Sequence, residues 1–98
     1  MLFAGTYTNR PAVTEENSKR SLQLFTNWTP PKGFEFKAHY AYSDGSGGMF
    51  IAEGTPETLL EATAPYIPFF EFKIVPVVEI TAAVPIFQRV NAWRDSIR

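Results

Sequence analysis

The sequence predicts an α+β domain in which two helices pack on one face of a four-stranded antiparallel sheet. Three observations support this prediction. Residues 70–75 and residues 34–42 alternate apolar with polar side chains, which is the period-two pattern of half-buried strands. Residues 18–28 place apolar side chains at helical spacing behind Thr14, a residue type that caps helices. Turn-forming residues divide the chain into the order strand, helix, strand, strand, helix, strand.

The first half of the chain supplies two strands and the helix between them. Residues 2–8 are rich in strand-forming side chains and end at a cluster of turn residues. Thr14 begins the helix, and the two glutamates after it suit the positive end of the helix dipole. The helix ends before Pro30, because the residue before a proline resists helical angles. Its inner face is expected to carry Ser18, Ser21, Leu22, Phe25 and Trp28.

The second half repeats the pattern. The pair Asp44-Gly45 favours a hairpin that leads into a strand over residues 49–53. Thr55 and the proline after it suit the start of the second helix. Residues 69–78 form the last strand of the sheet, and Pro76 places it at an edge because proline cannot donate a ladder hydrogen bond. The inner face of the second helix is expected to carry Leu59, Leu60 and Thr63.

This order of elements is that of a ferredoxin-like βαββαβ domain, with the first and third strands in the middle of the sheet. We expect a single domain over residues 1–98, made of a core over residues 1–80 and a helical extension over residues 81–98. The extra C-terminal helix is expected to begin at about Val84 or Pro85. Its apolar stripe is Ile86, Val90, Trp93 and Ile97, joined by Phe87.

Composition excludes several classes of function. The formal net charge of −1 offers no long-range attraction for nucleic acid or an anionic membrane. Without cysteine there is no thiolate nucleophile or zinc–thiolate site, and His39 as the only histidine excludes paired-His sites. We therefore expect no metal and no cofactor. The absence of cysteine, of a signal peptide at the first residues and of an apolar run of about 18 residues favours a cytoplasmic protein without a membrane partner.

The hairpin decides which side chains share a face of the sheet. A two-residue Asp44-Gly45 loop pairs Tyr40 with Met49 and Ala38 with Ile51, and we expect these residues to lie beneath the helices. A loop one residue longer would invert the assignment. The opposite face is expected to collect Phe3, Gly5, Tyr7, Glu35, Lys37, His39, Phe50, Ala52, Glu71, Lys73 and Val75.

That expected face predicts a homodimer. Exposed Phe3, Tyr7 and Phe50 would form an apolar patch that a soluble monomer rarely leaves open, and a second copy would cover it. Edge strands of the two copies would then bring charges of opposite sign together and set the register. The expected interface comprises Phe3, Glu35, Phe50, Glu71, Lys73, Val75 and Trp93.

The strand order, the chain length and residues 71–78 (Glu-Phe-Lys-Ile-Val-Pro-Val-Val) resemble the dimeric α/β-barrel superfamily. Within it, the chain is similar to small bacterial proteins of unknown function that open with Met-Leu-Phe and end the last strand in Val-Pro-Val. The similarity covers residues 1 to about 80. It implies a homodimer with facing sheets and a pocket inside or beside the barrel. Relatives include cofactor-free monooxygenases, heme-degrading enzymes and proteins without known activity, so the fold alone does not choose a function.

Two hypotheses follow. The first is a homodimer that binds a small ligand, or has a structural or regulatory role, with a ligand site at Tyr7, Lys37, His39 and Phe50. The second is a monooxygenase-like or isomerase-like enzyme in which His39 and Tyr7 work in the pocket. No catalytic residue is assigned on sequence grounds.

A third hypothesis is a module like an RNA-recognition motif, which shares this strand order. Phe3 and Phe50 would then be platforms on which bases stack. The third strand departs from that motif, because Ser46, Gly48 and Glu53 replace its basic and aromatic positions. Nucleic acid is therefore the least favoured partner.

Overall fold

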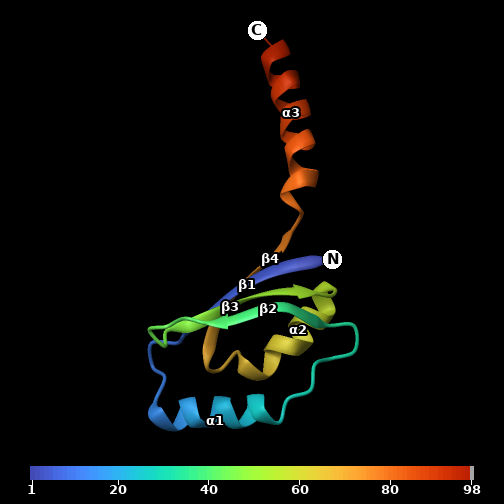
Figure 1. Ribbon diagram of the computed structural model, residues 1–98. Coiled ribbons are helices and arrows are strands. Elements are labelled where there is room, and N and C mark those ends of the chain that lie inside the picture. The colour runs from blue at the N-terminus through green and yellow to red at the C-terminus, as the bar shows by residue number, and fades with distance from the viewer. Residues whose placement is uncertain (98) are drawn as a thin grey trace.

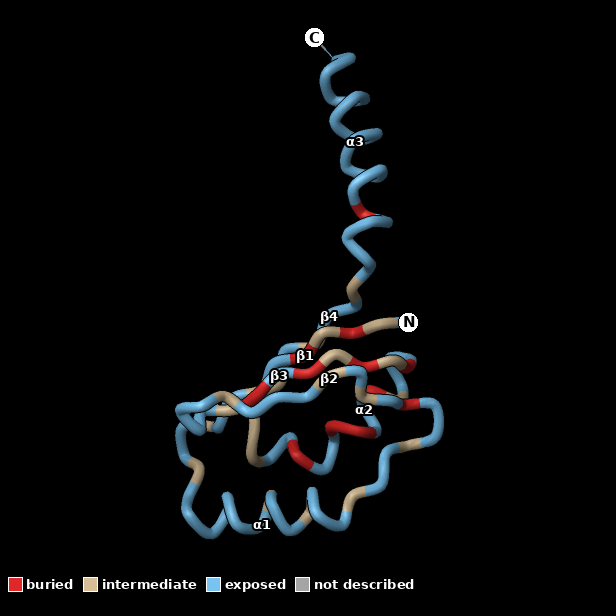
Figure 2. Tube along the Cα trace, in the orientation of Figure 1, coloured by how far each residue is buried: buried red, intermediate tan, exposed pale blue. Residues whose placement is uncertain are grey.

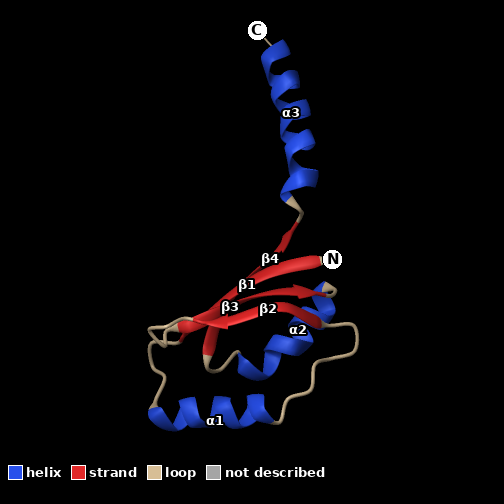
Figure 3. Ribbon diagram, viewed as in Figure 1, coloured by secondary structure: helices blue, strands red, loops and turns tan. Residues whose placement is uncertain are grey.

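The computed structural model describes residues 1–97, and Arg98, the last residue of the expected extension, lies outside the described residues. The chain forms one sheet with α1 and α2 on one side and a third helix that projects from it (Figures 1 and 3). The sheet is antiparallel throughout, in the order β2-β3-β1-β4, so the predicted α+β fold and its two edge strands are confirmed. The elements are β1 (Leu2–Asn9), α1 (Glu15–Thr26), β2 (Glu35–Ala41), β3 (Gly47–Glu53), α2 (Pro56–Thr63), η1 (Ala64–Tyr66), β4 (Phe70–Val77) and α3 (Ile80–Ser96).

The predicted caps and the predicted hairpin are present. The Thr14 side chain accepts a hydrogen bond from the backbone N–H of Asn17 at 3.1 Å, which begins α1. Thr55 and Thr58 exchange hydrogen bonds in a capping box at the start of α2. In the hairpin, Gly45 adopts φ = 76°, a left-handed conformation in which glycine has no Cβ penalty.

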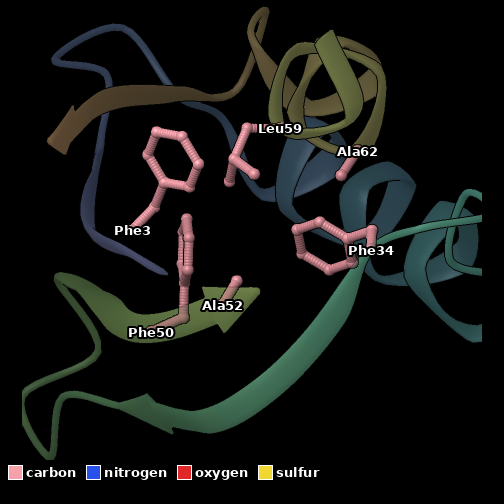
Figure 4. Packing of buried hydrophobic residues seen from close by; sticks show 6 residues of the cluster. All are labelled: Phe3, Phe34, Phe50, Ala52, Leu59 and Ala62. Carbon is pink, nitrogen blue, oxygen red and sulfur yellow. The ribbon is translucent and has the colours of Figure 1, made fainter. Parts of the chain in front are cut away.

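The hairpin register is as predicted, but the assignment of the faces is wrong. Tyr40 pairs with Met49 and Ala38 pairs with Ile51, yet these pairs lie on the face turned away from α1 and α2, here called the open face. The core lies on the other face, between the sheet and α2 (Figure 4). It consists of Phe3, Phe34, Phe50, Ala52, Leu59 and Ala62.

A β-bulge explains the inversion. The pairing of β2 with β3 shifts between Phe36 and Ala38, so Lys37 is an extra residue in its strand. The alternation therefore changes phase at the bulge. Phe34 and Phe36 face the helices before it, and His39 faces them after it, opposite Phe50 on β3. The aromatic side chains of residues 34–42 are therefore divided between the two faces of the sheet.

The first argument for a dimer, the exposure of Phe3 and Phe50, does not hold in this structure. Phe3 and Phe50 are 5% and 3% exposed, so the subunit's own core already shelters them (Figure 4). The Phe50 ring lies over Gly5, where an added Cβ would overlap it. Rings buried in this way are not available to an interface between subunits. They also cannot serve as stacking platforms, so the RNA-binding alternative lacks the surface it needs.

Both later helices differ in detail from the prediction. In α2 the inner face carries Leu59, Ala62 and Thr63, whereas Leu60 is 63% exposed. Helix α3 begins at Ile80, upstream of the expected start, and Pro85 lies inside it. A proline there removes one backbone hydrogen bond and crowds the preceding turn, yet α3 continues to Ser96.

Helix α3 has few contacts with the rest of the subunit. Ala83 is its one buried residue, and the helix extends the molecule to 60 × 30 × 21 Å (Figures 1 and 2). Its exposed large apolar residues, including the one just after it, are Ile80, Val84, Ile86, Phe87, Val90, Trp93 and Ile97. Among residues 1–97, no helix combines the length and the apolar character needed to cross a bilayer.

Adjacent leucines on α2 test the position of the core. Leu59 is 3% exposed and packs among the core rings, whereas Leu60 is 63% exposed. We expect Leu59→Ala to lower the free energy of unfolding by about 2–5 kcal/mol, because it leaves a cavity. The same change at Leu60 is expected to alter it by about 0.5 kcal/mol or less. Urea unfolding of both variants at one protein concentration measures the difference, and equal losses would contradict this core.

Candidate ligand-binding site

A cavity of about 440 Å³ lies between α1 and the helix-covered face of the sheet. Helix α1 buries none of its own residues, although one side of it faces the sheet. The cavity occupies the space between α1 and the sheet. From α1 it is lined by Ser18, Ser21 and Leu22 and, near or beyond the helix end, by Phe25 and Trp28. These are the residues that helical periodicity predicts for the inner face.

The wall of the cavity is aromatic and uncharged. Half of its lining residues are Phe, Tyr or Trp, and none is Asp, Glu, Lys or Arg. The large aromatic content of the chain thus borders a space as well as filling the core. The aromatic lining residues are Tyr7, Phe25, Trp28, Phe34, Phe36, Tyr42, Phe50, Tyr66, Phe70 and Phe72.

A hydrogen bond joins two polar side chains on the sheet wall. The Tyr7 hydroxyl lies 2.8 Å from Nε2 of His39. Tyr7 is on β1 and His39 is on β2, so the tyrosine ring reaches across β3 between them. It crosses at Gly48, the residue paired with Tyr7, where an added Cβ would overlap the hydroxyl. The missing side chain at Gly48 is therefore what allows the contact.

Aromatic rings hold His39 in place. The Phe36 ring stacks on the imidazole with the ring centroids 4.4 Å apart and the planes 20° from parallel. Phe25 approaches from α1, edge to face, at 6.0 Å. Burial lowers the pKa of His39 below its ordinary value. Burial, and to a smaller extent the nearby Tyr42, raises the pKa of Tyr7. At neutral pH the pair is thus an uncharged imidazole beside a protonated phenol.

A second tyrosine faces the cavity from η1. Tyr66 is 9% exposed, and its hydroxyl is buried without a hydrogen-bond partner. Its ring meets those of Phe25 and Trp28 with the centroids 6.4 Å apart in both cases. Burial raises the pKa of Tyr66, so its hydroxyl keeps its proton at neutral pH and can donate.

The family model described as "Domain of unknown function (DUF3303)" matches residues 1–91. The chain belongs to this family. The match extends from β1 into α3, so most of the projecting helix is part of the family domain. No curated protein matches the chain. The family description names no activity, and function has to be argued from the site.

The structure brings together three of the four residues predicted to bind a ligand. Tyr7, His39 and Phe50 line the cavity, but Lys37 does not. Lys37 is the bulged residue of β2, and its Nζ lies 3.2 Å from Oε2 of Glu35. Among residues 1–97, no group of three or more His, Asp or Glu side chains could hold a metal ion.

Sequence reasoning missed Tyr66 and Gly48 as parts of the site. Tyr66 lies between two prolines in a stretch without periodicity, so nothing in the pattern indicates where its hydroxyl points. The cavity itself had a signal in the two serines on the expected inner face of α1, at positions 18 and 21. Small polar side chains among aromatic ones leave space where a packed helix would have apolar bulk.

The single imidazole of the chain provides a direct test of its environment. We expect His39 to titrate below about 6.5, the value of a free histidine, because the cavity wall disfavours the imidazolium. The unfolded chain then binds this proton more tightly than the folded chain. The contribution of His39 to the free energy of unfolding is therefore complete above about pH 6.5 and is lost progressively as the pH falls from there through the lower pKa of the folded chain.

An NMR titration of the one imidazole resonance measures this pKa, with the urea-unfolded chain as the reference. Only one histidine is present, so the signal needs no assignment. A pKa equal to or above that of the unfolded chain would show that the imidazole is fully hydrated, contrary to the cavity described here.

Proposed function

We propose that the chain is a homodimeric protein that binds a small apolar ligand in the cavity between α1 and the sheet. The observation that supports this most directly is the combination of volume and lining. About 440 Å³ is within the range of small-molecule sites, which are mostly apolar and carry a few placed polar groups. Here those groups are the Tyr7–His39 pair and the Tyr66 hydroxyl.

The incomplete burial of α1 supports a binding function over a purely structural one. A helix that only covers a sheet buries its apolar face, yet Phe25 and Leu22 of α1 remain 44% and 64% exposed. An apolar ligand between the helix and the sheet would remove both surfaces from water, at about 25 cal/mol per Å² buried. Ligand binding would therefore complete the packing of α1.

Catalysis in the same cavity is the second candidate. It is favoured by the 2.8 Å contact between Tyr7 and His39, because an uncharged imidazole held by a hydroxyl can act as a general base. In the tautomer whose Nε2–H donates to the Tyr7 oxygen, Nδ1 of His39 would accept a proton from the ligand, and Tyr7 would orient the ring. Both candidates place the ligand in one cavity, so a binding test applies to both.

The open face supports the homodimer part of the proposal. The sheet pairing places a band of mostly apolar side chains there, and no helix of the subunit core covers it. Tyr40, Met49 and Val75 are 63%, 37% and 43% exposed. The band consists of Leu2, Ala4, Ala38, Tyr40, Met49, Ile51 and Val75.

Charges at the two edges of the open face favour a second copy of this chain as the occupant. One edge strand carries Glu35 and Lys37, and the other carries Glu71 and Lys73. When two such sheets face each other with β2 of one copy beside β4 of the other, each acid of one copy can meet a base of the other. Complementary charge of this kind fixes orientation more than it adds affinity.

Helix α3 adds exposed apolar surface beyond an edge of the sheet. It follows β4, an edge strand, and all but one of its residues are exposed or half-buried. Its 17 residues span about 26 Å at 1.5 Å per residue. Four strands at about 4.8 Å apart are narrower than that. The helix is therefore long enough to cross the sheet of a second subunit with Trp93 and its apolar neighbours against it.

Substitutions on α1 test the binding proposal. We expect naphthalene to bind the wild-type chain, and Ser21→Phe to weaken binding at least about tenfold, because the ring would occupy the cavity. Gln23→Phe on the exposed side of α1 is the matched control and should bind as wild type. The His39 resonance reports binding. Absence of saturable binding, or equal binding by all three chains, would contradict a site in this cavity.

Solution mass tests the dimer. We expect light scattering to give twice the 11.1 kDa of the chain. Met49→Glu should shift the mass toward one chain, because it buries a charge in the apolar band of the open face. Leu60→Glu adds the same charge on the outer surface of α2 and should leave the mass unchanged. A wild-type chain that stays at 11.1 kDa at high concentration would overturn the dimer and leave the cavity unaffected.

A further inference from the structure

The buried hydroxyl of Tyr66 has no hydrogen-bond partner. Among the described residues that are not exposed, it is the one buried side-chain nitrogen or oxygen without a hydrogen-bond partner. Leaving such a group unpaired costs about 1–3 kcal/mol. Neighbouring hydroxyls of the cavity are paired: Thr63 donates to the Leu59 carbonyl and Ser21 to the Ser18 carbonyl, both at 2.9 Å. Tyr66 lines the cavity, and the proton of its buried hydroxyl has no acceptor among the described residues.

Flat aromatic surfaces lie directly beside this hydroxyl. The rings of Phe25 and Trp28 stack on each other with the centroids 5.9 Å apart and the planes 16° from parallel, and the edge of Tyr66 meets both. On the sheet, where these two rings contact Phe25 and Trp28, the imidazole of His39 and the ring of Phe36 are also close to parallel, at 20°. Walls made of stacked rings fit a planar partner better than a branched aliphatic one.

The absence of formal charge around the cavity defines the ligand further. No lining residue is Asp, Glu, Lys or Arg. A charged ligand would give up its hydration without meeting a counter-ion, which is strongly unfavourable in an apolar site. The ligand that suits this wall is uncharged.

Volume limits the number of rings. A cavity of about 150 Å³ lined by apolar side chains holds one benzene molecule. The cavity here is about 440 Å³, close to three times that volume. It has room for two or three fused rings.

We infer that the ligand is an uncharged planar aromatic compound of two or three rings, oriented by an oxygen atom that accepts a hydrogen bond from the Tyr66 hydroxyl. This inference rests on the proposed binding function and adds the chemical class of the ligand. Phe25 and Trp28 stack on its rings. The Tyr7–His39 pair on the sheet is available to a second polar group of the same compound.

Four probes of the same ring size test the class: naphthol, naphthalene, naphthoate and naphthyltrimethylammonium. The titrations use the Trp93→Phe chain, in which Trp28 is the sole tryptophan and reports from the cavity wall. We expect naphthol to bind tightest and both charged probes to bind at least about tenfold more weakly. Tyr66→Phe should weaken naphthol about tenfold and leave naphthalene unchanged. Tyr40→Phe, which removes a hydroxyl on the open face, should change neither.

The outcomes separate this inference from the function on which it rests. Equal binding of naphthol and naphthalene, unaffected by Tyr66→Phe, would overturn the hydroxyl anchor while leaving the binding site in place. Tightest binding by either charged probe would overturn the uncharged class. Failure of all four probes would overturn the proposed function itself.

A measurement without ligand gives a second test. Tyr66→Phe removes the unpaired hydroxyl, so the empty chain should unfold at a higher temperature than wild type. A lower unfolding temperature would show that the hydroxyl already has a partner in the empty chain, and would overturn its role as an anchor that awaits the ligand.

Discussion

The bulge at Lys37 determines what each face of the sheet can do. With strict alternation from Phe36, Ala38 and Tyr40 would face the helices, and His39 would lie on the open face. The extra residue reverses this order, so that His39 stacks on Phe36 inside the cavity and Tyr40 reaches the open face. One inserted residue thus brings the only imidazole of the chain to within 2.8 Å of the Tyr7 hydroxyl. The aromatic site and the apolar open face both depend on it.

Two glycines on the central strands also shape the cavity, because they make room for aromatic rings. The ring of Phe50 lies over Gly5, and the ring of Tyr7 lies over Gly48. A side chain at either glycine would displace the ring above it. Because both rings lie along the sheet rather than standing up from it, they do not reach α1. The small Ser18 and Ser21 on the facing side of α1 do not fill the remaining distance, and the cavity is the result.

The elements of the fold were predictable because each has a local cause, whereas the faces and the site depend on tertiary relations. Thr14 and Thr55 mark helix starts, and Pro76 marks an edge, by chemistry that acts within a few residues. The bulge left no trace, since residues 34–42 alternate cleanly through Lys37. The predicted start of α3 is too late because proline favours the first turn of a helix, whereas Pro85 lies in the interior of α3. Tyr66 gave no signal, because an unpaired hydroxyl is defined only by its surroundings.

The correction of the faces also changes how binding and assembly relate to each other. If Phe3 and Phe50 had been exposed, one surface would have served both the dimer and the ligand. Evidence against the dimer would then also have been evidence against ligand binding. The subunit's own helices shelter these rings, and the cavity lies on the helix side of the sheet. A second copy on the open face would be separated from the ligand by the full thickness of the sheet. The proposed binding would therefore need only one subunit, and the exposed apolar surface of α3 is a separate reason to propose two.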